Sequence, residues 1–452
     1  MSGHDFFQHP ILNSPYEEPL WHHVLDENGQ PTSQEPENER RKSDRHISPV
    51  PKSKRAGAAA QASFDYADDD KYDPAWMIND IRQHVKSWRE LPATADWGVT
   101  PATRRLLDHW RNHNFASIRP FFCQREAVET IIWLTEIVPG RPKQYGRILD
   151  HLQGGNKEAN PELFRLAMKM ATGAGKTTVM AMLIAWQTIN AVQAPASKSY
   201  SKGFLIVTPG ITIRDRLRVL NPVDPDSYYE KRELVPMDML ADITQAKVVV
   251  TNYHAFQQRE KAKVSKGTRG AIEGWRQEKI VTAETEGEML RRAVGDLFNM
   301  KNVVVINDEA HHCYREKAGT DEVAEFKGDD KEEAKENNKA ARIWISGIEK
   351  LKAKIGVRAI YDLSATPFFL RGSGYREGTL FPWTVSDFSL MDAIECGIVK
   401  LPRVPILDNM PMADGEPIYR DIWKHIGKKM PKKGRAKSGG GNPEALAEVV
   451  PL

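Results

Sequence analysis

Residues 166–178 read LAMKMATGAGKTT and combine a short apolar run with a glycine-rich turn. The run from Leu166 to Met170 predicts a buried strand, and the apolar residues after Thr177 predict a helix. A glycine-rich loop between a strand and a helix is typical of a phosphate-binding loop, because glycines let backbone N–H groups approach phosphate oxygens. Met170 replaces the first glycine of the general pattern, so a glycine-rich turn that merely caps a core helix remains the alternative.

This loop supplies the first candidate site residues. We predict that Lys176 reaches the β- and γ-phosphates of a nucleotide and that the Thr177 hydroxyl binds Mg²⁺. The positive end of the helix dipole adds to the attraction for phosphate. The predicted nucleotide-binding residues of this loop are Thr172, Gly173, Ala174, Gly175, Lys176, Thr177 and Thr178.

The second motif is Asp308-Glu309-Ala310-His311, which follows the apolar run at residues 303–306 after Asn307 and begins with two carboxylates. A carboxylate at the end of a buried strand can hold the Mg²⁺ of a nucleotide, and Asp308 fits that role. Glu309 is placed to orient and deprotonate an attacking water. We therefore predict Lys176, Asp308 and Glu309 as catalytic residues, and Thr177 with Asp308 as metal ligands.

The third motif is Ser364-Ala365-Thr366-Pro367, which again follows a strand-like run. Two interpretations of His311, in the second motif, remain open. It could couple the two motifs through hydrogen bonds with Ser364 or Thr366, or it could be a packing histidine.

Short apolar runs alternate with helical patterns through the middle of the chain. They are rich in β-branched residues and do not alternate with polar ones, which is typical of strands buried on both faces. Strands separated by helices predict an α/β fold with a parallel sheet flanked by helices. Besides the first strand, the predicted strands are residues 204–207, 248–250, 303–306 and 359–363.

The three motifs, in this order, resemble motifs I, II and III of superfamily 2 helicases. The resemblance implies a P-loop NTPase with a RecA-like domain. Gln124 resembles the glutamine with which that superfamily reads adenine. Thr208, Pro209 and Gly210 resemble a segment that contacts the nucleic-acid backbone, and Thr251 with Asn252 resembles the next such segment.

Within the superfamily, the chain most resembles the Res subunit of type III restriction enzymes, which carries the motor and the nuclease. The resemblance lies in residues 169–212, 307–316 and 361–400 and extends over roughly residues 75–405. It implies ATP and Mg²⁺ as cofactors, double-stranded DNA as the track, and a separate modification (methyltransferase) subunit as partner.

The family also has a second RecA-like domain, which brings an arginine finger, and a nuclease domain. We find no sequence pattern for either one, and therefore expect the N-terminal half of a larger enzyme, with the other half as a possible separate chain. Three functions stay open: the ATP-driven DNA translocase of a restriction endonuclease, an ATP- and DNA-binding half-motor without turnover, and a superfamily 2 helicase of repair or RNA metabolism. Whether this chain is itself an enzyme is left undecided.

Composition excludes other classes of protein. The chain carries 64 Lys and Arg against 61 Asp and Glu, a net charge of +3, so no global basic field predicts nucleic-acid binding. Its three cysteines are far apart and show no zinc-site spacing. We see no signal peptide and no segment apolar enough to span a membrane. These features predict a cytoplasmic protein.

Domain boundaries follow from shifts in composition. We expect a largely disordered tail at residues 1–75, because residues 26–75 are polar and cannot bury enough surface to offset the entropy of ordering. The basic residues of this tail leave a DNA-gripping arm as the alternative. A helical segment is expected at 76–140, a RecA-like domain with charged insertions at 141–400, and a basic, glycine-rich linker at 401–452.

Overall fold

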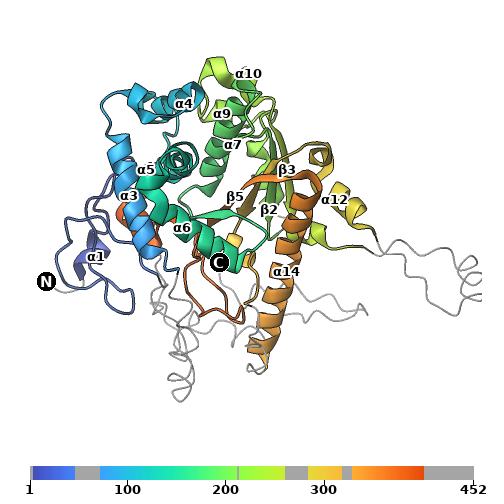
Figure 1. The fold of residues 1–452 in the computed structure, drawn as a ribbon. Coiled ribbons are helices and arrows are strands. Elements are labelled where there is room, and N and C mark those ends of the chain that lie inside the picture. Colours follow the sequence, from blue (N-terminus) through green and yellow to red (C-terminus); the bar gives the residue numbers. More distant parts are fainter. Residues whose placement is uncertain (1–3, 46–71, 211–212, 260–283, 318–327, 402–452) are drawn as a thin grey trace, which may run out of the picture. The chain divides into compact units, whose positions relative to one another are not determined.

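The computed structural model describes residues 4–45, 72–210, 213–259, 284–317 and 328–401. At its centre lies a six-stranded sheet with the order β3-β2-β4-β5-β1-β6, in which all neighbouring strands are parallel (Figure 1). The strands are β1 (Arg165–Met170), β2 (Gly203–Thr208), β3 (Lys247–Asn252), β4 (Val303–Asp308), β5 (Val357–Ser364) and β6 (Thr384–Phe388).

Five of these strands were predicted from sequence and are confirmed. In β2 and β4 every residue is buried, as expected for β-branched runs covered on both faces. The sixth strand, β6, was not predicted, because Ser386 and Asp387 interrupt its apolar residues. It pairs with β1 and so places β1 inside the sheet.

Helices cover both faces of the sheet, and Figure 1 shows α5 and α7 on one side and α12 and α14 on the other. The first face buries Met168 and Ile306 against α7, and the second buries Val305 against Trp344 of α14. The major helices are α3 (Ala75–Arg89), α4 (Pro101–Asn112), α5 (Phe122–Ile132), α6 (Pro142–Ala159), α7 (Lys176–Gln193), α12 (Glu286–Val294) and α14 (Asp329–Ile355). Shorter helices are α1 (His4–Gln8), α8 (Ile213–Arg216), α9 (Tyr228–Lys231), α10 (Leu240–Ile243) and α15 (Leu390–Glu395).

This architecture confirms the predicted fold class, a RecA-like P-loop domain with a parallel sheet between layers of helices. The helical segment before the sheet is present as α3, α4 and α5. Its Trp88 and Trp110 are buried in the core, so these rings are held by packing. No described helix is long and apolar enough to cross a membrane.

The N-terminal segment, residues 4–45, differs from the expected tail. Its Arg40 pairs with Glu126 of α5 at 2.5 Å, and its Arg41 pairs with Glu395 of α15 at 2.6 Å. Burial raises the pKa of Glu126, but Arg40 and its neighbour Arg89 outweigh this effect and hold the pKa at about 2. The disorder expectation is therefore wrong for residues 4–45, because polar residues counted as solvated have buried partners far along the chain. Residues 46–71, like 402–452, lie outside the described part.

A buried polar network lies inside the sheet, away from its edges. Asp362 of β5 accepts hydrogen bonds from Arg165 Nε at 2.8 Å, Trp383 Nε1 at 2.9 Å and Asn307 Nδ2 at 2.7 Å. Asn307 in turn accepts a hydrogen bond from Trp344 Nε1 of α14 at 3.0 Å. Arg165, Asp362 and Asn307 are each 0% exposed, so this network links β1, β4, β5 and α14 without solvent.

Candidate nucleotide site

The phosphate-loop candidate lies at the carboxyl end of β1 and leads directly into α7. Gly173 and Gly175 have φ angles of +88° and +86°, in the left-handed region that favours glycine. The backbone N–H groups of Gly173, Gly175, Lys176 and Thr177 donate no hydrogen bond within the described residues. Unpaired donors at a helix N-terminus bind anions well, so the loop has the chemistry that a phosphate group requires.

Gln124 packs directly against this loop. Its Nε2 donates to Ala174 O at 2.9 Å, and its Oε1 accepts from Phe121 N at 3.1 Å. A Cβ atom at Gly175 would lie only 2.2 Å from Gln124 Nε2, so the side chain of Gln124 occupies the space that glycine leaves open. Both ends of the amide that was expected to read adenine are thus bonded to the protein backbone in this structure.

Two carboxylates of the second motif meet the lysine of the loop. Lys176 Nζ forms an ion pair with Glu309 and lies 3.9 Å from Asp308 Oδ1. Burial raises the pKa of Asp308, and the positive charge of Lys176 opposes that rise. Glu309 takes a left-handed backbone conformation with φ +51°, which turns the chain sharply at the end of β4. Lysine and carboxylates therefore share one edge of the sheet, beside the unpaired N–H groups.

The second and third motifs also meet. His311 Nδ1 lies 2.8 Å from Ser364 Oγ, and the same hydroxyl accepts a hydrogen bond from Thr366 N at 3.0 Å. Burial lowers the pKa of His311 to about 3, and the neighbouring His312 and Lys176 act in the same direction. The imidazole is neutral at pH 7 and forms the contact that a coupling role requires, although packing alone would also bury it.

The residues expected to contact DNA lie at the carboxyl ends of β2 and β3 and in the turn after β2, at the same edge of the sheet. Thr208 is buried, and its Oγ1 lies 2.9 Å from Gly210 O and 3.4 Å from Thr251 O. Its hydroxyl therefore holds the turn after β2 in place. Pro209, Gly210, Thr251 and Asn252 are half-buried at this edge, and all five candidates lie together as the strand order requires.

Metal ligation at this edge depends on few side chains. Among the described residues, no group of three or more His, Cys, Asp or Glu side chains could hold a metal ion by itself. Thr177, in the first turn of α7, and Asp308, at the end of β4, are the two candidate ligands. An ion held by so few protein groups takes its remaining oxygen ligands from phosphate and water, as Mg²⁺ commonly does.

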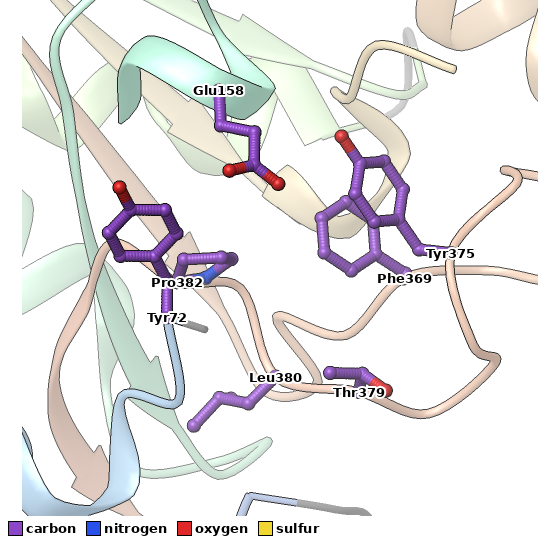
Figure 2. Close-up of a pocket in the computed structure, with 7 residues that line it drawn as sticks. All are labelled: Tyr72, Glu158, Phe369, Tyr375, Thr379, Leu380 and Pro382. Atoms are coloured by element: carbon purple, nitrogen blue, oxygen red, sulfur yellow. The ribbon is translucent and has the colours of Figure 1, made fainter. Parts of the chain in front are cut away.

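Two hollows lie apart from the loop. The first is a cavity of about 20 Å³, which has room for one water, and Figure 2 shows the side chains that line it. Its lining residues are Tyr72, Glu158, Phe369, Tyr375, Thr379, Leu380 and Pro382. A larger cavity of about 300 Å³ lies beside Leu166, near the beginning of β1, and has a mostly apolar lining that includes Leu152 and Tyr361. Neither contains a residue of the three motifs.

One residue beside the loop was missed by the sequence analysis. Arg232 Nη1 lies 3.1 Å from Thr178 Oγ1 in the first turn of α7. It belongs to a polar stretch without a motif, and no pattern in the sequence connects it to a residue 54 positions earlier.

Comparisons with known proteins agree with this geometry. The family model for the res subunit of type III restriction enzymes matches residues 117–369, more than half of the chain. A search of the curated proteins gives no match, and neither does a search of the solved structures. The matched range includes the phosphate loop and all three motifs, in a domain of the helicase motor type. The chain therefore belongs to the family of type III restriction enzyme res subunits.

Proposed function

We propose that this chain binds and hydrolyses ATP with Mg²⁺ and uses the energy to move along double-stranded DNA as the motor of a restriction system. The observation that carries the proposal is the carboxyl edge of the sheet. There, the unpaired N–H groups of the loop lie beside Lys176, and Lys176 contacts Asp308 and Glu309. Such an edge supplies both the anion site and the acid–base group that phosphoryl transfer to water requires.

Each residue has a defined task in this proposal. The loop from Thr172 to Thr178 would hold the phosphates, and Lys176 would leave Glu309 for the β- and γ-phosphates. The freed Glu309 carboxylate would then orient and deprotonate the attacking water. Mg²⁺, held by Thr177 and Asp308, would neutralise phosphate charge.

The proposal extends to DNA through the same edge. Ser364 and Thr366 would pass the state of the nucleotide from His311 to the carboxyl ends of β2 and β3 and the turn after β2, which would contact the DNA backbone. As the family implies, a modification subunit would supply sequence recognition. We place the protein in the cytoplasm, where its three free, buried cysteines remain reduced.

The test is ATP binding and ATP hydrolysis by the purified chain, each measured with and without duplex DNA. We expect Lys176→Ala to weaken ATP binding by a factor of about ten or more, because it removes a charge-assisted contact. Glu309→Gln should keep ATP binding and lower turnover by about 10²–10⁴-fold, the usual contribution of a general base. The exposed Lys301 provides the control variant Lys301→Ala, which should match the wild type.

The outcomes separate the remaining functions. Turnover that rises with DNA and is lost in Glu309→Gln supports the motor. ATP binding without turnover would leave an ATP- and DNA-binding module, and stimulation by RNA but not by duplex DNA would favour an RNA helicase. Equal ATP affinity in the wild type and Lys176→Ala would overturn the site itself.

A further inference from the structure

Arg232, at the end of α9, is held in place beside the phosphate loop. Its guanidinium Cζ lies 3.7 Å from the centroid of the Tyr228 ring, and its Nη2 donates to Tyr228 Oη at 2.8 Å. The other terminal nitrogen, Nη1, donates to Thr178 Oγ1 at 3.1 Å. The contact with the Tyr228 ring and the two hydrogen bonds hold the guanidinium against the first turn of α7.

The positive charge of Arg232 has no carboxylate partner among the described residues, although its side chain is half-buried. Nearby arginines differ in this respect. Arg218 pairs with Asp226 at 2.5 Å, and Arg105 pairs with Asp238 at 2.6 Å. A partly desolvated cation that lacks a counter-charge is stabilised when an anion binds next to it.

The position of Thr178 indicates which part of a nucleotide Arg232 can reach. Residues two apart on a helix point about 200° from one another, so Thr178 and Lys176 face opposite sides of α7. Lys176 faces the carboxylates, where the β- and γ-phosphates and the water would lie. A Cβ at Gly175 would lie 3.7 Å from Thr178 Oγ1, so the hydroxyl to which Arg232 donates borders the loop at Gly175.

We propose that Arg232 is a nucleotide-contacting residue and binds the α-phosphate. Tyr228 and Thr178 hold its guanidinium in place. In phosphate loops the backbone N–H groups hold the α- and β-phosphates and the lysine reaches the β- and γ-phosphates, so a second cation on the opposite side of α7 serves the α-phosphate end. This inference rests on the proposed ATP site and adds a contact to it.

The test measures the affinity of Arg232→Gln for ATP, for ATP with sulfur on the α-phosphate and for ATP with sulfur on the γ-phosphate. We expect ATP to bind about ten to a hundred times more weakly, as for loss of a hydrogen bond between charged groups. The wild type should bind ATP and its α-thio analogue with different affinities. Arg232→Gln should bind the two with similar affinities. The ratio of the affinities for ATP and for the γ-thio analogue should be the same in Arg232→Gln as in the wild type.

Controls separate direct contact from a structural effect. Arg218→Gln changes an exposed arginine of the same region and should bind all three nucleotides as the wild type does. A purely structural role of Arg232 would weaken all three nucleotides equally and leave every ratio unchanged, which would overturn the inference. Arg232→Lys, which keeps the charge, should recover part of the ATP affinity and gives a second variant in case Arg232→Gln does not fold.

Failure of this inference differs from failure of the proposed function. Suppose that the wild type binds ATP and that Lys176→Ala does not. If Arg232→Gln then keeps the wild-type affinities for all three nucleotides, only the proposed role of Arg232 is wrong. If the wild type binds no ATP, both proposals fall together.

Discussion

The interior of the sheet and its carboxyl edge use neighbouring residues of the same strands in opposite ways. On β4, Asn307 is 0% exposed and bonded to Asp362 and Trp344, whereas the next residue, Asp308, accepts one hydrogen bond, from Glu309 N, and lies 3.9 Å from Lys176. The polar groups of the interior have nearly all their partners within the protein, whereas the edge keeps loop N–H groups without a protein partner among the described residues, beside the ion pairs of Lys176. Whether a polar residue near a motif stabilises the fold or belongs to the candidate site therefore depends on how many hydrogen-bond partners it has within the protein.

The largest difference between the two regions should be in stability. Asp362→Ala would leave Arg165 as a buried charge without its partner, because both side chains are 0% exposed and their atoms lie 2.8 Å apart. We expect the free energy of unfolding to fall by about 3–5 kcal/mol, measured by urea denaturation.

Asp308→Ala is the matched control, since it removes a carboxylate from the end of the adjacent strand. Burial already disfavours the charged form of Asp308, so its removal should change the free energy of unfolding by less than about 1 kcal/mol. Metal-dependent ATP turnover should be lost instead. Equal destabilisation by the two variants would contradict the division between interior and edge.

A second prediction concerns the dependence of stability on pH, which should come partly from the edge. The pKa of His311 is about 3 in the folded chain, against about 6.5 in an unfolded one. Its contribution is present above pH 6.5 and is lost as the pH falls toward 3, because only the unfolded chain takes up the proton. Between pH 7 and pH 5 the loss should be about 2 kcal/mol.

Urea denaturation at the two pH values measures this loss, and His311→Asn should reduce it. His254→Asn, which changes an exposed histidine, should keep the wild-type dependence. If His311→Asn loses as much stability between pH 7 and pH 5 as the wild type does, other titrating groups cause the pH dependence.

The third prediction tests the contact between the loop and Gln124. Gly175→Ala places a methyl group 2.2 Å from Gln124 Nε2 in a backbone conformation with φ +86°. We expect a loss of about 1–2 kcal/mol in the free energy of unfolding, together with weaker ATP binding.

Gly287→Ala, in α12, provides the comparison, because no heavy atom lies within 4 Å of the added group. It should stabilise the chain by about 0.5–1 kcal/mol without affecting ATP. If both alanine variants have the same unfolding midpoint, the close approach at Gly175 is not a constraint.

Features formed by residues close together in the sequence could be predicted, and features formed by residues far apart in the sequence could not. The phosphate loop, five strands and the order of the motifs come from patterns of a few neighbouring residues, and they were found. Arg165 and Asp362 are 197 positions apart, and Arg41 and Glu395 are 354 positions apart. Such pairs have no local signature, so no sequence pattern predicts the interior network or the packing of the N-terminal segment. Arg232 was missed for the same reason.

The fit between Gln124 and Gly175 also has an evolutionary consequence. The amide of Gln124 occupies the space that Gly175 leaves by lacking a side chain, and the φ of +86° disfavours any side chain at 175 by itself. A lineage that gained a side chain at 175 would have to change the backbone turn there as well as the residue at 124, whereas a shorter residue at 124 remains compatible with glycine at 175. Among related chains, we therefore expect glycine at 175 to persist even where the residue at 124, 51 positions earlier in the sequence, differs.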